Sequence, residues 1–236
     1  MTRARALTPD RAARVASRAL VAGLAGLALV PTAAGAQRVA KLLHTASARS
    51  APAGRVAGRL AATRPLTGGP TVVPVIRTAR ARGRTWLRVR LPQRPNGATA
   101  WIAADGTIPG VAHWAVRVDR SRRRATVFHD GRRARSFRVV VGRPSMPTPV
   151  GRFFVAERVR QAHGSPVGPW VLATSAYSPV LQQFDGGPGQ IGLHGRTGLP
   201  DPLGSAASHG CVRFSDRAIA WLARRARAGT PVAIVR

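Results

Sequence analysis

Residues 191–216 read I-G-L-H-G-R-T-G-L-P-D-P-L-G-S-A-A-S-H-G-C-V-R-F-S-D, and this stretch decides how the rest of the chain is interpreted. It contains Cys211, the only cysteine of the 236-residue protein, directly after the residues S-H-G. A second histidine, His194, lies upstream and is also followed by a glycine. A lone cysteine accompanied by histidines is typical of a thiolate nucleophile that an imidazole activates. We therefore predict a nucleophilic cysteine site within this stretch.

The chemistry of a thiol sets what the neighbouring residues must supply. With an ordinary pKa of about 8.5 a thiol is mostly protonated at neutral pH, so His194 or His209 is needed to take the proton. If residues 209–211 are extended, His209 and Cys211 share one face. The glycine at position 210 allows close approach of the backbone, whose N–H groups bind a developing oxyanion. The alternatives are an inert buried cysteine or a zinc site formed with both histidines, which lacks a fourth ligand.

The charge of the chain is strongly unbalanced, with 38 Lys and Arg residues against 8 Asp and Glu and a net charge of +30. Such a chain is expected to associate with an anionic surface. Nucleic acid is disfavoured because the arginines are spread along the whole chain and aromatic residues are few. The alternative is an arginine-rich coding bias with solvated side chains. No two acidic residues are close in sequence, so nothing indicates a two-carboxylate glycosidase.

The first 36 residues have the pattern of an export signal. Five arginines precede an apolar run over residues 19–30, Pro31 follows, and residues 34–36 read A-G-A. The run is too short to span a bilayer comfortably, and the small residues fit a cleavage site. We expect export to the cell wall or periplasmic space, with an uncleaved membrane anchor or a buried helix as alternatives.

Residues 37–110, which lie between the predicted signal and the domain that contains Cys211, divide into two parts. Residues 37–68 are rich in Ala, Arg, Thr, Gly and Pro and are predicted to form a linker, with a short helix over residues 39–43. Residues 69–110 are predicted to form a small β-barrel. Its expected strands are residues 71–76, 85–91 and 98–102. The sequence W-L-R-V-R-L-P-Q-R-P-N-G, followed by a W-I pair, resembles the SH3-like modules that precede catalytic domains in exported cell-wall enzymes.

Residues 112–236 are predicted to form a second, mostly β domain. The dipeptide Asp130-Gly131 indicates a hairpin turn. A helix is expected to begin at Ser215 or Asp216 and to stop at Gly229. The expected strands are residues 114–118, 125–129, 135–141, 151–155, 171–173, 190–193 and 230–235.

Three motifs in this second domain resemble the L,D-transpeptidase (YkuD) family. The first is H-G at residues 194–195 with S-H-G-C-V-R at residues 208–213. The second is V-G at residues 141–142 with T-P-V-G-R-F at residues 148–153, and the third is G-T-P-V at residues 229–232. The resemblance covers about residues 114–235. Residues 214–216 and the Arg-Thr pair at 196–197 depart from the common family pattern, which leaves substrate preference in the intervening loop open.

The resemblance implies a YkuD-like β-sandwich or barrel catalytic domain with a short C-terminal helix, and a cysteine acyltransferase acting on peptidoglycan. Cys211 would attack the peptide bond before the terminal D-alanine of a tetrapeptide stem, and an amine of a neighbouring stem would resolve the thioester as a 3→3 cross-link. The resemblance implies no cofactor and no metal. By this resemblance, His194 would be the general base and the Gly195 carbonyl would orient it. His209, Gly210 and Cys211 would form the oxyanion hole, and Ser208 would support the loop. Arg213 would bind a substrate carboxylate.

Several readings remain open at this point. His209 could be purely structural, and Arg213 could serve a structural ion pair. If water replaced the acceptor amine, the enzyme would be an L,D-carboxypeptidase or another cysteine hydrolase of stem peptides. A non-catalytic wall-binding protein is the third reading, in which the upstream β-module holds the ligand. A monomer is expected.

Overall fold

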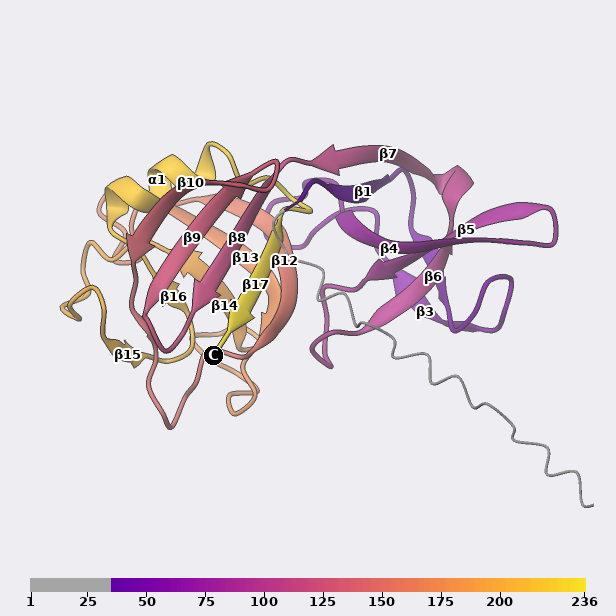
Figure 1. The fold of residues 1–236 in the computed structure, drawn as a ribbon. Helices are drawn as coiled ribbons and strands as arrows, with labels where there is room; N and C mark the ends of the chain where they lie inside the picture. Colours follow the sequence, from indigo (N-terminus) through magenta and orange to yellow (C-terminus); the bar gives the residue numbers. More distant parts are fainter. Residues whose placement is uncertain (1–34) are drawn as a thin grey trace, which may run out of the picture. The chain divides into compact units, whose positions relative to one another are not determined.

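The computed structural model describes residues 35–236, which are built mostly of β-strands with one short α-helix (Figure 1). The predicted signal peptide over residues 1–36 lies outside the described residues, apart from its last two positions. Within the described part, no helix is long and apolar enough to cross a membrane. The prediction of a mostly β fold with a short helix near the C-terminus is confirmed.

The N-terminal domain is one antiparallel sheet with the strand order β3-β2-β6-β5-β4-β1-β7. Its strands are β1 (Gln37–Leu42), β2 (Ala46–Arg49), β3 (Val56–Leu60), β4 (Val72–Ala81), β5 (Arg84–Arg90), β6 (Thr99–Ala103) and β7 (Thr107–Ala112), with the 3₁₀ turn η1 (Ala104–Gly106) before β7. The strands predicted over residues 71–76, 85–91 and 98–102 correspond to β4, β5 and β6. The SH3-like character of this domain stays a prediction.

The predicted linker over residues 37–68 is wrong, because this segment contains β1, β2 and β3. Strand β1 lies between β4 and β7 and pairs antiparallel with both, so it is not the short helix expected over residues 39–43. Its inward-facing residues Ala40 and Leu42 are buried. The small side chain of Ala40 weakens the apolar alternation that marks a strand, and its pairing partners lie far along the chain, where a local pattern cannot register them.

The C-terminal domain is organised around a sheet with the strand order β10-β9-β8-β17-β12-β13-β14-β16 and a small two-stranded sheet, β11-β15. The strands are β8 (Trp114–Asp119), β9 (Arg124–His129), β10 (Arg132–Arg138), β11 (Val141–Gly142), β12 (Gly151–Arg160), β13 (Trp170–Tyr177), β14 (Gln190–His194), β15 (Ala206–Ser208), β16 (Val212–Arg213) and β17 (Pro231–Val235). The predicted turn at Asp130-Gly131 joins β9 to β10, and both residues have the positive φ that such a hairpin turn needs.

Helix α1 (Asp216–Ala223) begins where the sequence indicated, because the Ser215 side chain accepts a hydrogen bond from the Ala218 N–H. Ile219 and Leu222 are fully buried in the core of the domain. The predicted end at Gly229 is wrong. The N–H groups of residues 225 and 226 both bond to the Leu222 carbonyl, which tightens the last turn and ends the helix early. Gly229 has a φ of +88° and lies in the turn before β17.

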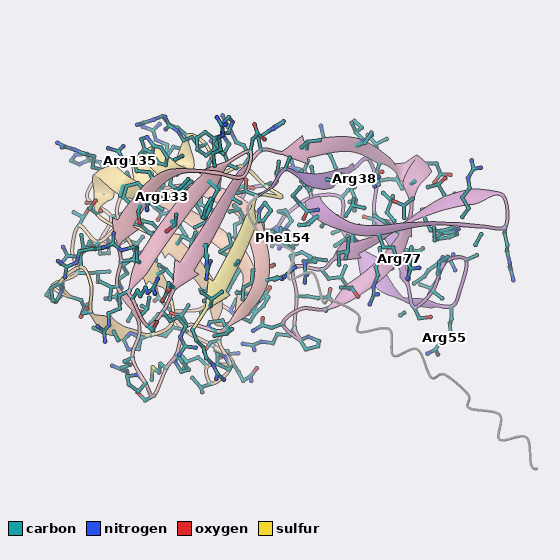
Figure 2. All side chains as sticks on the ribbon, in the orientation of Figure 1. Arg38, Arg55, Arg77, Arg133, Arg135 and Phe154 are labelled. Carbon is teal, nitrogen blue, oxygen red and sulfur yellow. The ribbon has the colours of Figure 1, made fainter. Side chains whose placement is uncertain are left out.

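Strand β12 is buried on both faces and joins the two domains. Phe153 and Val155 pack into the C-terminal core, whereas Phe154 and Ala156 pack into the core of the N-terminal sheet. This follows from the two-residue period of a strand, which sends successive side chains to opposite faces. Figure 2 labels Phe154 on this strand. The two domains therefore share a packed apolar contact.

Arginine side chains project from both domains and give the molecule its positive charge. Figure 2 labels Arg38, Arg55 and Arg77 on the N-terminal domain and Arg133 and Arg135 on strand β10, and all five are exposed. Exposed positive charge is thus present on both domains.

Replacing Phe154 by alanine is expected to lower the free energy of unfolding by about 3–5 kcal/mol, because it opens a cavity in the core that the two domains share. Urea denaturation followed by tryptophan fluorescence measures this. Phe154→Leu is the matched control and should cost under about 1.5 kcal/mol. A Phe154→Ala protein within experimental error of the wild type would show that the domains do not depend on each other for stability.

Candidate active site

The centre of the site is the pairing of two strand segments that are distant in the sequence. Strand β16 runs parallel to β14, with Leu193 opposite Val212 and His194 opposite Arg213. Because paired residues of a sheet point to the same face, the side chains of His194 and Arg213 lie side by side. One step before this register the Gly192 N–H donates a hydrogen bond of 3.3 Å to the sulfur of Cys211. The pairing thus brings the predicted nucleophile and the predicted base together.

The thiol of Cys211 is protonated in the resting protein. Burial of the thiol raises its pKa, although the residue as a whole keeps part of its surface exposed. The hydrogen bond from Gly192 and the positive charge of Arg213 oppose this shift but do not reverse it. A neighbouring base is therefore required before the sulfur can act as a nucleophile.

The imidazole of His194 is buried and neutral. Its Nδ1 lies 2.7 Å from the Gly195 carbonyl oxygen, which can only accept, so Nδ1 carries the proton and Nε2 has the free lone pair. Burial lowers the pKa of His194 to about 4, and the hydrogen bond to Gly195 partly offsets the effect. The ring is thus held in the tautomer and charge state that a general base needs at neutral pH.

Gly192 leaves the space between His194 and Cys211 open. A Cβ atom at this position would lie 3.8 Å from Cδ2 of His194, the ring carbon next to Nε2, and 4.0 Å from the sulfur of Cys211. Both functional groups therefore border the same small space. Gly192 was not among the predicted site residues, and its signal in the sequence was a glycine inside an apolar strand, which often marks a close backbone approach.

The turn that carries the nucleophile differs from the extended segment considered from the sequence. Gly210 has a φ of +121°, so residues 209–211 bend and are not the extended segment that would place His209 and Cys211 on one face. The ring of His209 instead lies against Phe184, with ring centroids 5.1 Å apart. Gly210 is required here because other residues rarely adopt this φ, and a Cβ atom would lie 2.9 Å from Cδ1 of Ile191.

Ser208 fixes this turn from inside. Its Oγ donates to the Cys211 carbonyl at 2.6 Å and accepts from the Gly210 N–H at 3.1 Å. The Gly210 N–H already donates to Ser208, so it is not free to bind an oxyanion as the sequence predicted. The N–H groups of His209 and Cys211 have no acceptor among the residues that the structure describes. These two groups are the ones available to bind an oxyanion.

Thr148 supports the same turn from a neighbouring loop. It is fully buried, and its Oγ1 donates to the Gly210 carbonyl and accepts from the Gly142 N–H, both at 2.8 Å. A Cβ atom on Gly142 would collide with the Met146 carbonyl oxygen at 2.3 Å, so this close approach requires glycine. The sequence identified this loop only through its resemblance to the family, and the role of Thr148 in holding the turn is an addition from the structure.

Asp216 organises the segment after His194. Its Oδ1 accepts the Arg196 N–H at 2.7 Å, and its Oδ2 accepts the hydroxyl of Thr197. A Cβ atom on Gly195 would lie 2.3 Å from the same carboxylate, so glycine is needed for this packing. Asp216 thereby fixes the backbone whose carbonyl orients His194. The sequence noted Asp216 as a possible helix cap and as a departure from the family pattern, and gave it no role in the site.

Arg213 is buried and forms an ion pair with the partly exposed Asp201. The sequence left open whether Arg213 binds a substrate carboxylate or serves a structural ion pair, and the structure supplies the ion pair. Asp201 was not among the predicted site residues because it lies 12 positions away, in the loop before β15. The pair ties that loop to the strand that follows Cys211.

A hollow of about 470 Å³ lies beside the site, next to the segment that follows His194. Among its lining residues are His163, Trp170, Thr197 and Asp216. Neither Cys211 nor His194 is among the lining residues. Within the described part of the chain, no three metal-ligating side chains converge on one point.

Residues 113–234, more than half of the chain, match the YkuD family, the L,D-transpeptidase catalytic domain. The chain belongs to this family. A Bacillus licheniformis protein designated L,D-transpeptidase YkuD is 27% identical over 158 residues, which cover 64% of this chain and 87% of that protein. Its Bacillus subtilis namesake is 30% identical over 111 residues, which cover 47% of this chain and 59% of that protein.

Among solved structures, an L,D-transpeptidase from Mycobacterium smegmatis is similar with a TM-score of 0.40 and 17% identity, covering 70% of this chain and 99% of that one. The family match confirms the resemblance read from the three motifs. The YkuD domain begins close to the predicted boundary at residue 112. The protein therefore has a C-terminal catalytic domain of the L,D-transpeptidase family, which is a family of acyltransferases. A β-domain precedes it in the chain.

We predict that stability depends on pH through His194. In the folded protein its pKa is about 4, whereas in the unfolded chain it is near 6.5, so the unfolded state binds more protons between these values. The free energy of unfolding should therefore fall by about 3 kcal/mol as the pH drops from above 6.5 to below 4. Denaturant titrations of the wild type and His194→Gln measure this contribution as their difference, and parallel curves for the two proteins would contradict it.

Replacing Thr148 by valine should destabilise the turn at residues 208–211, because it leaves the Gly142 N–H and the Gly210 carbonyl buried without partners. We expect a loss of about 1–3 kcal/mol in the free energy of unfolding. The rate of Cys211 alkylation should change with it. Thr148→Ser keeps the hydroxyl and serves as the control, and it should restore the alkylation rate. Equal behaviour of the valine and serine proteins would argue against the hydrogen bonds.

Proposed function

We propose that this protein is an exported peptidoglycan L,D-transpeptidase that forms 3→3 cross-links through a thioester on Cys211. The observation that carries the proposal is the placement of the Cys211 sulfur and the His194 ring around Gly192, with Nδ1 of the ring held by the Gly195 carbonyl. The family supplies the substrate class, peptidoglycan stem peptides. The charge of +30 supports retention on an anionic wall surface, and the signal-like residues 1–36 support export.

Acylation begins with transfer of the thiol proton to Nε2 of His194. The sulfur then attacks the carbonyl carbon of the peptide bond before the terminal D-alanine of a tetrapeptide stem. The negative charge that develops on the carbonyl oxygen is bound by the open N–H groups of Cys211 and His209, each such donor contributing roughly 3 kcal/mol in the transition state. The His194 imidazolium gives its proton to the departing D-alanine amine, and a thioester remains on Cys211.

Deacylation repeats the same steps with a different nucleophile. The side-chain amine of a neighbouring stem attacks the thioester carbon, and Nε2 of His194 takes a proton from that amine. The same N–H groups bind the second oxyanion, and the thiolate leaves and regains the proton. The products are the 3→3 amide bond and the free thiol. If water entered in place of the amine, the product would be a tripeptide and the enzyme a carboxypeptidase.

Supporting residues act through this pair. Ser208 and Thr148 hold the turn that presents the N–H groups, and Asp216 holds the backbone that orients His194. Arg213 keeps a positive charge beside the thiol, which favours the thiolate. We propose that its remaining N–H groups receive the donor carboxylate, with Asp201 fixing the guanidinium.

The test is mass spectrometry of the protein incubated with disaccharide-tetrapeptide. We expect release of D-alanine, a 3→3 dimer and a transient thioester on Cys211. Cys211→Ala should abolish all three, and His194→Gln should lower the rate by at least about a thousandfold. Arg77→Ala, an exposed change in the other domain, is the control and should be fully active.

Two outcomes would redirect the proposal. Tripeptide without dimer, in the presence of acceptor, would make the enzyme a carboxypeptidase. No product and no thioester would reject catalysis on this substrate and favour the wall-binding reading.

A further inference from the structure

The connection between β13 and β14, residues 178–189, is a loop closed at its base. The Ser178 N–H donates to the Gly189 carbonyl at 2.8 Å, and the Ser178 hydroxyl accepts from the N–H groups of Val180 and Leu181. At the other end, Phe184 and Gly187 exchange two backbone hydrogen bonds. The loop is thus a defined unit with a base at Ser178 and a tip at Phe184.

A single arginine of the N-terminal domain fills the base of this loop. The guanidinium of Arg94 donates to the carbonyl oxygens of Ser178 at 2.9 Å, Leu181 at 2.8 Å and Pro188 at 3.2 Å. Gly189 has a φ of +66°, and a Cβ atom there would lie 2.2 Å from the Leu181 carbonyl oxygen and 3.2 Å from Nη2 of Arg94, so glycine is needed where these groups meet. One planar cation therefore gathers three loop carbonyls, which the compact ammonium of lysine cannot do with the same geometry.

The strand that leads into the loop is fixed by the same segment. Asn96 donates to the Tyr177 carbonyl at 2.7 Å and accepts from the Tyr177 N–H at 2.8 Å, as a neighbouring strand would. The Tyr177 hydroxyl donates to the Pro92 carbonyl, and the Arg94 guanidinium lies over the Tyr177 ring at 5.1 Å. Residues 92–96 are therefore a rigid support for the loop and for the end of β13.

The tip of the loop reaches the nucleophile turn. The Phe184 ring lies 5.1 Å from the ring of His209, with an angle of 31° between the two planes. Phe184 keeps 47% of its surface exposed, although it is a large apolar side chain. His209 is followed by Gly210 and Cys211. The two rings thus form a partly open aromatic wall next to the segment that carries the thiol.

We propose that the N-terminal domain is a functional part of the active site and that Arg94 is its positioning residue. Arg94 holds loop 178–189 so that Phe184 and His209 stay together as one wall of the substrate site. A partly open aromatic wall of this kind suits the backbone and methyl groups of a stem peptide. The substrate part rests on the proposed function, whereas the positioning part concerns only loop 178–189 and its contact with His209.

The positioning part is tested without any reaction. In Arg94→Ala, hydrogen exchange of residues 178–189 should rise at least about tenfold, while the strands of both domains keep their protection. The NMR signal of the His209 ring should move in the same direction as in Phe184→Ala, because both changes remove the Phe184 ring from it. Arg94→Lys should be intermediate. Arg77→Ala, which removes the same charge from the same domain, should match the wild type in both measurements.

The substrate part is tested by kinetics on the tetrapeptide. Arg94→Ala and Phe184→Ala should each raise KM by about tenfold with kcat within about twofold, since they alter binding of the stem and leave the reacting groups in place. The double variant should be no worse than Phe184→Ala alone, because Arg94 acts through that ring. Multiplied effects in the double variant would overturn the positioning role.

The two proposals fail in different ways. Unchanged hydrogen exchange in Arg94→Ala, or an unmoved His209 signal, would refute the positioning of the loop even if the wild type is an active transpeptidase. A wild type that neither releases D-alanine nor forms a thioester would refute the proposed function. The exchange and NMR results would still decide whether Arg94 positions the loop.

Discussion

The parallel pairing of β14 with β16 is the interaction on which the site depends. It places His194 beside Arg213 and, one step earlier, Gly192 beside Cys211. Parallel neighbours need a long connection, and here residues 195–211 supply it as a loop that contains both the Asp201 ion pair and the turn at Gly210. If the pairing slipped by one residue, the thiol and the imidazole would point to opposite faces. The hydrogen bonds of Ser208, Thr148 and Asp216 oppose such a slip, because they fix the segments on either side of the pairing.

The resting charge state follows from how this pairing is buried. Burial raises the pKa of Cys211 and lowers that of His194, so both shifts favour a neutral thiol beside a neutral imidazole over an ion pair. Proton transfer from Cys211 to His194 is therefore unfavourable at rest. In the proposed mechanism, binding of the negative charge by the open N–H groups of His209 and Cys211 offsets this cost. The positive charge of Arg213 favours the thiolate but disfavours the imidazolium, so it cannot form the ion pair by itself. A thiol kept neutral at rest is also poorly nucleophilic toward other electrophiles.

The sequence predicted correctly those elements that depend on contacts between residues close together in the chain. The Asp130-Gly131 turn, the Ser215 cap and the alternating strands of β5 and β8 could all be predicted from the sequence, and the S-H-G-C motif indicated the family. The wrong predictions concern segments whose conformation depends on contacts with residues far away in the sequence. Residues 37–68 form strands because β4 and β6 pair with them, which no window of that Ala-rich segment reveals. Residues 209–211 are not extended because Gly210 bends the chain, and the ring of His209 lies against Phe184. Arg94 could not be distinguished from the other arginines, since its partners are three carbonyls more than 80 residues away.

The scarcity of acidic residues explains why arginine contacts take this form. With 8 carboxylates for 38 basic side chains, ion pairs cannot fix most of the arginines. Several instead donate to backbone carbonyls, as Arg94 does in loop 178–189 and Arg158 does at the Ala223 carbonyl. Others lie over aromatic rings, as Arg225 does over Trp221 at 4.0 Å. A guanidinium suits both uses because it is planar and carries five donors, whereas lysine offers one compact charge. The arginine bias of the chain, which the sequence alone could attribute to coding composition, therefore has structural consequences, and the clearest lies beside the active site.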